Sequence, residues 1–497
     1  MKQFEEFFQL FALLILAAVL IYFVPVSLNR LLFLLVLPLA WKSKKDYFWL
    51  AFFIVMLDYP GGLFHGGERE DMFRLPIYSF RPGLGFAIQE LFFIVIFLKA
   101  WIRKEKSTNK VMIFYGKELK ALFILWIVLV AVSPLFGMSS ASYRNVYKMA
   151  IALTLFYSTI RLISTKEQLT AFLRLIFPFA FVGILLIIYS LINKQQIIAL
   201  VKPGVLNTQG YFNRAGLTGV WERPIELVHT LFICFTGSLF LLSCPKNNFK
   251  RGYLIVVNLL SFIAIFLSAT RSWFLAFVAG YFLFYLFNIK RFKRYIGPVM
   301  LIALIAFYFV VTVMPVLRRQ ITNAWGRLST IENLFEGDLT AGGTASRYDV
   351  RAPRVMEGFA SSSIMLGAAY SDRFYEYADG HVGYHNILLN TGIFGSLLFF
   401  IVIFRIMTFP FKMGRKYAVF NKPHIKVSTI AIVMLLILNF GTQTVGFTPD
   451  GINRVFLMAF AVLLVEIAMR AEWKDYLILK EKSKKLQGQG GNLINES

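Results

Sequence analysis

Two histidines stand close together in the stretch His381-Val-Gly-Tyr-His385-Asn386, which directly precedes a long apolar segment. The chain has only five histidines among its 497 residues, so this pair concentrates groups that can accept a proton near neutral pH. At a membrane surface, His385 could serve as a general base toward a hydroxyl group, with His381 and Asn386 as secondary candidates. The alternative is structural: His385 and Asn386 cap a helix, and Gly392 and Gly395 allow close helix packing.

Arginines form the second group of candidate residues. A guanidinium group donates paired hydrogen bonds to phosphate or carboxylate, so arginines on the outer side of a membrane predict an anionic ligand there. Arg271 lies between two apolar runs, in Ser268-Ala-Thr-Arg271-Ser-Trp273. Arg214 and Arg223 belong to a glycine-containing stretch that ends at Pro224, a residue typical of a first helical turn. The alternative is that individual arginines reach lipid headgroups or pair with nearby acids. The full set of candidates is Arg214, Arg223, Arg271, Arg347, Arg351 and Arg354.

The elements that must position these residues are hydrophobic helices. The chain is 58% hydrophobic and 16% charged, which excludes a soluble fold. Apolar segments of about 17 to 22 residues recur along nearly the whole chain, and each is long enough to cross a hydrocarbon core of about 30 Å as a helix. We therefore predict an all-α, polytopic transmembrane bundle of about 12 to 14 helices. The candidate segments are 7–24, 28–41, 47–58, 83–101, 119–136, 145–163, 171–192, 225–243, 253–267, 273–287, 296–314, 387–408, 427–440 and 454–470.

Lysine indicates how this bundle is oriented. Lysine-rich connections at 42–45, 99–120, 246–251, 290–294 and 412–426 alternate with lysine-poor ones, which is the pattern of cytoplasmic and outer loops. The alternation places both chain ends in the cytoplasm and residues 316–385 in one large extracytoplasmic loop that contains short helices. It predicts a membrane domain over residues 1–471 and a polar cytoplasmic tail over 472–497. Because much of the net charge of +25 lies in the cytoplasmic loops and tail, we expect contact with lipid and no nucleic-acid partner.

The order of these motifs resembles the O-antigen ligase and O-antigen polymerase superfamily of bacterial polysaccharide assembly. Members typically show a Ser/Thr-Arg-Ser/Gly motif at the start of a mid-chain helix, as in Thr270-Arg271-Ser272, and then a large periplasmic loop with an early arginine, here Arg347. That loop ends in His-Asn-x-x-Leu followed by Gly-x-x-Gly, as in His385-Asn-Ile-Leu-Leu and Gly392-Ile-Phe-Gly. An upstream glycine-containing segment that begins with arginine is similar to Arg214-Ala-Gly-Leu-Thr-Gly. The resemblance covers residues 211–398, and elsewhere only the helix count agrees.

The resemblance implies a glycosyltransferase of the bacterial cytoplasmic membrane that works on its outer face without metal or other cofactor. The donor would be a glycan linked to undecaprenyl diphosphate, and the acceptor a hydroxyl group on another glycan or lipid. Arg214, Arg271 and Arg347 would neutralise the leaving diphosphate, with Arg351 or Arg354 as the alternative to Arg347. His385 would take the acceptor proton as the anomeric carbon is inverted. A chain-length regulator is a candidate protein partner, and the choice between ligase and polymerase stays open.

Two other functions are compatible with some of the same residues. A transporter of lipid-linked oligosaccharide would also be polytopic, but transport favours polar groups near the bilayer midplane and repeated halves, and the sequence shows neither. A metal-dependent transferase would use the outer acids Glu68, Glu70 and Asp71, which are more simply explained as partners of nearby arginines. Two histidines without a third nearby ligand do not complete a zinc site.

Overall fold

The computed structural model of the chain describes residues 2–23, 34–56, 58, 88–106, 114–193, 227–245, 248–268, 270–292, 318, 321–322, 325, 347–441, 443–446 and 452–492. Within these ranges every regular element is a helix, and β-pairing is limited to one isolated bridge between Ser363 and Gly367. The all-α prediction is confirmed for this part of the chain.

The helices follow the apolar segments of the sequence closely. In chain order they are α1 (Lys2–Phe23), α3 (Val36–Lys42), α4 (Asp46–Met56), α5 (Ile88–Lys106), α6 (Gly116–Val132), η3 (Ser133–Phe136), α7 (Ser140–Leu162), α8 (Lys166–Ile176), α9 (Phe179–Asn193), α12 (Val228–Ser243), α13 (Arg251–Leu267), α14 (Arg271–Phe292), η6 (Arg347–Arg351), α18 (Ala352–Ala360), α19 (Asp372–Tyr377), α20 (Gly383–Lys416), η7 (Ala418–Phe420), α21 (Pro423–Val427), α22 (Ile430–Gly441) and α23 (Ile452–Asn492).

Four helical segments among the described residues are long and apolar enough to cross a membrane. They are 116–136, 166–189, 383–416 and 423–441. Helices α4, α12 and α13 are apolar but shorter. The predicted total of 12 to 14 spans therefore stays a prediction, and the candidate segment 296–314 lies outside the described residues.

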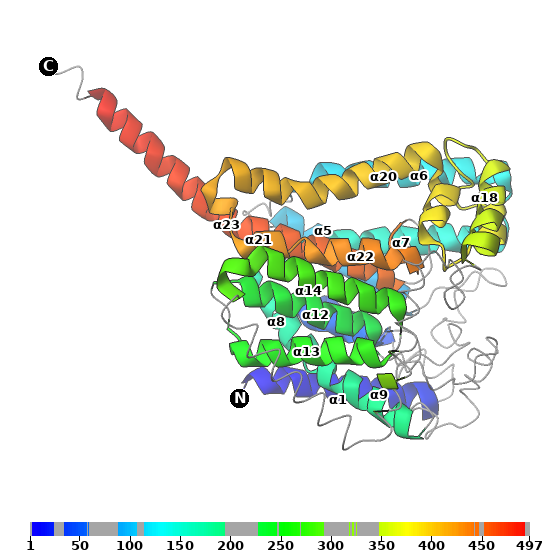
Figure 1. Cartoon of the computed structure of the whole chain (residues 1–497), viewed down its shortest axis with the longest axis horizontal. Helices are drawn as coiled ribbons and strands as arrows, with labels where there is room; N and C mark the ends of the chain where they lie inside the picture. Colours follow the sequence, from blue (N-terminus) through cyan, green and yellow to red (C-terminus); the bar gives the residue numbers. More distant parts are fainter. Residues whose placement is uncertain are drawn as a thin grey trace.

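The helices lie side by side in a bundle with a separate small layer at one end (Figure 1). Helices α20 and α6 run along one edge, α1, α9 and α13 run along the opposite edge, and α12, α14 and α22 lie between them (Figure 1). All 16 residues of α12 are buried, as expected of a helix that is apolar on every face and sits in the middle of a bundle. The N-terminus and the outward end of α23 both lie at the end of the bundle opposite α18 (Figure 1).

The end layer, which we call the cap, comprises residues 347–382. It consists of the single π-turn η6, helices α18 and α19, the loop between those two helices, and residues 378–382 that lead into α20. Val355 and Phe374 of the cap are buried together with Leu389 of α20 in a small hydrophobic cluster separate from the main core. The cap therefore packs on the first turns of α20, where His385 lies.

Helix α23 is much longer than the predicted span at 454–470. It continues without interruption past residue 471 to Asn492. Glu472, the first residue of the predicted tail, is buried and forms an ion pair with Lys422. One of its carboxylate oxygens lies 3.1 Å from Nε2 of His424. The first residues of the predicted tail therefore pack against the bundle.

Candidate functional site

His385 lies in the first turn of α20, directly beneath the cap. Its side chain is half-buried, and its ring makes no hydrogen bond with the described residues. The helix begins at Gly383 without a side-chain cap, so neither His385 nor Asn386 serves as the cap that the structural alternative required. His385 is therefore held at the cap end of the bundle, and no described residue occupies its ring nitrogens.

Asn386, the next residue, is completely buried and fully hydrogen-bonded. Its Oδ1 accepts from the backbone N–H of Asp379 (3.0 Å), and its Nδ2 donates to the carbonyl of Asp379 (2.6 Å) and to Oε1 of Gln443 (2.9 Å). These bonds join three segments: the cap, the start of α20 and the chain after α22. Asn386 has no polar group left for a substrate, so it positions the turn that carries His385.

The other candidate residues of the cap are held by the cap itself. Asp379 accepts at one carboxylate oxygen from Arg351 Nη1 (3.3 Å) and from the backbone N–H of His381 (2.9 Å). Arg354 is exposed and donates to the carbonyl of Glu376. Arg351 thus pairs with an acid, as the structural alternative for individual arginines predicts.

Arg271 is the first residue of α14 and is half-buried. The turn before it is closed by a hydrogen bond between the hydroxyl groups of Ser268 and Thr270, and α13 ends at Leu267. The predicted helical hairpin with Arg271 at its turn is confirmed. Arg347 is the first residue of the π-turn of the cap, whereas Arg214 and Arg223 lie outside the described residues.

Arg271 lies at the same end of the bundle as the cap. At the far end of α14, Asn288 Nδ2 donates to Ser243 Oγ at the end of α12 (3.4 Å). Nearby, Phe240 contacts the ring of His424 in α21, with 6.5 Å between ring centroids. Helices α21 and α22 lead from His424 toward the cap, and Gln443, just after α22, bonds to Asn386 at the start of α20. Because α14 packs along α22, its first residue lies at the cap end.

A buried Asp58–His229 pair at the start of α12 was not predicted from the sequence. Oδ1 of Asp58 accepts from Nδ1 (2.7 Å) and from the backbone N–H of His229 (3.1 Å), while Oδ2 accepts from the N–H of Thr230 (2.7 Å). The His229 ring contacts Trp273 nearly at a right angle, with 5.9 Å between centroids. Trp273 is two residues after Arg271, so this pair supports the start of α14. The only sequence signal was an acid ending one apolar segment and a histidine near the start of another.

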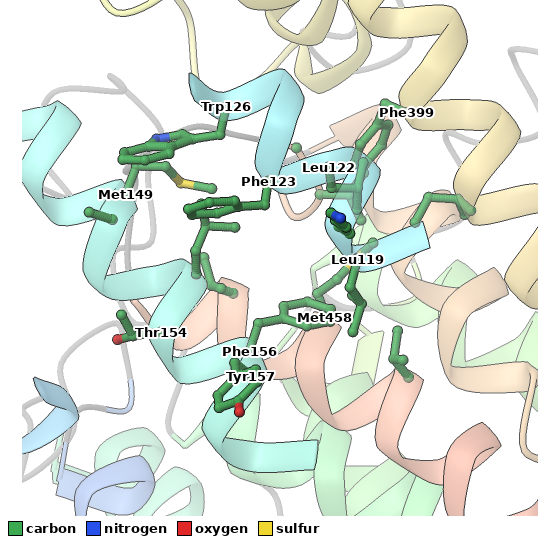
Figure 2. A pocket seen from close by; sticks show the side chains of 18 of the residues that line it. Leu119, Leu122, Phe123, Trp126, Met149, Thr154, Phe156, Tyr157, Phe399 and Met458 are labelled. Carbon is green, nitrogen blue, oxygen red and sulfur yellow. The ribbon is translucent and has the colours of Figure 1, made fainter. Parts of the chain in front are cut away.

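Helices α5, α6, α7, α20 and α23, with residues 443–446, line a cavity of about 770 Å³. Figure 2 shows aromatic and aliphatic side chains around it, among them Phe123 and Trp126 of α6 and Met149 of α7. This volume is within the range of small-molecule sites, and an apolar lining of this kind suits a hydrocarbon chain. Gln443, the partner of Asn386, lines the cavity, so the residue that follows His385 in the chain is one hydrogen bond away from the cavity lining.

The charged residues of the cavity lining all lie near helix ends. They are Lys120 in the first turns of α6, Arg161 at the end of α7 and Arg454 at the start of α23. The Arg161 guanidinium lies over the ring of Tyr157, 4.8 Å from its centroid. Nε1 of Trp126 and Nε of Arg161 are buried without a hydrogen-bond partner among the described residues. The cavity therefore offers buried donors in an otherwise apolar surface.

Asp372 forms hydrogen bonds that connect the cap to the segment between α6 and α7. Its Oδ1 accepts from the backbone N–H (2.9 Å) and hydroxyl (2.5 Å) of Ser139 and from the hydroxyl of Ser142 (2.6 Å). These hydrogen bonds to the charged form, with that of the Ser139 hydroxyl the strongest, hold the pKa of Asp372 below its ordinary value. The N–H of Tyr370 also donates to Ser133 Oγ (3.0 Å). The cap is thus joined to α6 and α7 as well as to α20.

Among the described residues, no three His, Cys, Asp or Glu side chains lie close enough to hold a metal ion. The acids of the metal-dependent alternative, Glu68, Glu70 and Asp71, lie outside those residues.

No protein-family model matches this chain, and no curated protein is significantly similar to it. The function is therefore inferred from the site.

Proposed function

We propose that this chain is a membrane glycosyltransferase of the O-antigen ligase and polymerase type, which transfers a glycan from undecaprenyl diphosphate to an acceptor hydroxyl. The observation that carries the proposal is the link between His385 and the apolar cavity. Asn386 holds the turn that carries His385 and bonds to Gln443, which lines the cavity. A proton-accepting ring that is linked through Asn386 and Gln443 to an apolar cavity suits a donor whose leaving group is attached to a long prenyl chain.

In this proposal His385 is the base and the arginines stabilise the leaving diphosphate. His385 accepts the proton of the acceptor hydroxyl, whose oxygen forms a bond to the anomeric carbon of the donor sugar. The bond between that carbon and the diphosphate oxygen breaks with inversion, and undecaprenyl diphosphate leaves with the electron pair. Arg271, at the cap end of α14, donates to the diphosphate as its charge develops. Arg347 and Arg214 complete the cationic set in this proposal.

The bundle supports an orientation with the cap on the outer face. The N-terminus and the outward end of α23 lie at the end opposite the cap (Figure 1). Lys412 and Lys416 lie in the last turns of α20 and Lys422 follows that helix, so all three lie toward that same end. Because lysine collects on the cytoplasmic side, the cap and His385 would then face away from the cytoplasm.

A transporter accounts for the described residues less well. Transport sites place charged or polar groups near the bilayer midplane. In this bundle Lys120, Arg161 and Arg454, the charged residues of the cavity, lie near the ends of their helices. This arrangement fits a lipid held along the bundle better than a polar cargo crossing it.

The test of this proposal is His385→Ala, with His381→Ala as the matched control. We expect His385→Ala to lower glycan transfer in vesicles at least about 100-fold, the usual scale for removing a positioned base. His381 is exposed, and its backbone bond to Asp379 survives in alanine, so His381→Ala should retain most activity. Both variants should reach wild-type abundance and keep binding the lipid-linked donor, because the arginines are retained. Wild-type transfer by His385→Ala, measured as polymer or ligated product on a gel, would refute the proposed mechanism.

A further inference from the structure

Helix α20 is broken at Gly392, and a loop of the cap occupies the break. In an unbroken helix the N–H groups of Ile393 and Phe394 would donate to the carbonyls of Leu389 and Asn390. Instead they donate to the carbonyls of Ile364 (2.9 Å) and Met365 (3.1 Å).

The two carbonyls freed in α20 are bonded by the same loop. Leu389 accepts from the N–H of Ala368 (2.7 Å), and Asn390 accepts from the N–H of Ala369 (2.9 Å). The Asn390 side chain also donates from Nδ2 to the carbonyl of Ala369 (2.6 Å). Four backbone bonds to residues 363–369, which we call the docked loop, thus replace two bonds of the helix.

Two glycines make this docking sterically feasible. Gly392 has φ +66° and ψ −173°, a combination that is essentially restricted to glycine. A Cβ on Gly392 would overlap the carbonyl of Met365, and one on Gly367 would overlap the carbonyl of Leu389. In the structural alternative Gly392 allows close packing between helices, whereas in the structure it makes room for the docked loop.

The docked loop exposes apolar side chains beside an apolar face of α20. Ile364 is 55% exposed and Met365 64% exposed. Their backbone partners, Ile393 and Phe394, begin a stripe of exposed apolar residues that continues along α20, at a spacing that places them on one helix face. The stripe consists of Ile393, Phe394, Leu397, Ile401 and Phe404, and each is between 42% and 65% exposed.

We propose that the docked loop is a membrane contact in which Ile364 and Met365 lie among the acyl chains of the lipid leaflet next to the cap. The stripe belongs to residues 383–416, one of the segments that are long and apolar enough to cross a membrane. We therefore expect lipid acyl chains to contact the stripe. Broken backbone at membrane depth requires replacement partners for the freed groups, and the docked loop supplies them at the break.

This contact would also set the depth of the site. His385 precedes Gly392 by seven residues, or roughly 10 Å along the helix axis. With the docked loop at the edge of the hydrocarbon core, His385 lies near the outer edge of the headgroup layer. The membrane contact itself does not depend on the proposed catalytic function.

The test places a nitroxide spin label on Met365→Cys in the full chain, reconstituted into vesicles of phosphatidylethanolamine and phosphatidylglycerol. Leu397→Cys on the stripe is the lipid-facing control, and Glu357→Cys, exposed on α18, is the solvent-facing control. The native cysteines, Cys234 and Cys244, are buried, and wild-type protein treated with the same reagent reports their background.

Accessibility to molecular oxygen, which enriches in hydrocarbon, is compared with accessibility to the water-soluble complex nickel(II) ethylenediaminediacetate. We expect the oxygen-to-nickel ratio at position 365 to match that at 397 and to exceed that at 357 several-fold. Hydrogen exchange at Ala368 and Ala369 verifies that the loop stays docked in the labelled protein. A label at 365 that is as accessible to nickel as the label at 357 overturns the proposal.

Discussion

Gly392→Ala tests whether the loop of the cap is held by the break in α20. Docking adds two backbone hydrogen bonds beyond those of an unbroken helix, and at about 1 kcal/mol net for each bond it contributes about 2 kcal/mol. An alanine held in the backbone conformation of Gly392 costs about 1–3 kcal/mol in strain, which alone offsets this contribution. The overlap of its Cβ with the Met365 carbonyl then favours the undocked loop.

The assay is amide hydrogen exchange of the full chain in lipid nanodiscs. A loss of about 2 kcal/mol corresponds to roughly 30-fold faster exchange, and we expect it at Ala368 and Ala369. The amides of Ile393 and Phe394 should stay protected, because an unbroken helix provides them with new carbonyl partners. This contrast separates undocking of the loop from general unfolding of the protein.

The matched control is Gly252→Ala in α13. Nothing lies within 4 Å of the position that its Cβ would occupy, so the substitution should leave exchange at Ala368 unchanged. It should stabilise α13 slightly, because alanine is the better helix former by about 1 kcal/mol. If Ala368 and Ala369 kept wild-type protection in Gly392→Ala, the account of the helix break would be wrong.

Three further predictions follow from the site. In Asn386→Asp, the two hydrogen bonds that the buried Nδ2 donates become contacts between two acceptor oxygens. Glycan transfer measured in vesicles should therefore fall at least about tenfold, although His385 itself is unchanged. Ala150→Trp should fill part of the cavity and raise KM for the lipid-linked donor, whereas Val278→Trp, outside the cavity lining on α14, should leave KM unchanged. Hydrogen bonds lower the pKa of Asp372, so its ionised carboxylate stabilises the folded protein. This contribution to the free energy of unfolding should be complete above about pH 4 and should disappear as pH falls through the lowered pKa. Melting curves should therefore separate wild type from Asp372→Asn at pH 6 and bring them together in strong acid.

The sequence by itself determined the elements whose cause is local. Apolar length decides where a hydrophobic helix runs, so the segment 119–136 corresponds to α6 with η3, and 427–440 lies within α21 and α22. The helical hairpin that presents Arg271 was predicted for the same reason, since its turn lies between two apolar runs. Composition also decided the helical class, which the described residues confirm.

Partners distant in the chain were decided only by the tertiary structure. Asp58 and His229 are 171 residues apart, and Asn386 and Gln443 are 57 apart, so no local pattern links either pair. The conformation of Gly392 was likewise not predictable from the sequence, which indicates only a small residue within a helix. Its conformation exists because a loop some 25 residues earlier supplies hydrogen bonds to the groups that the break leaves free. Helix length follows from neighbouring residues, whereas buried polar groups take their partners from whichever segments packing brings together.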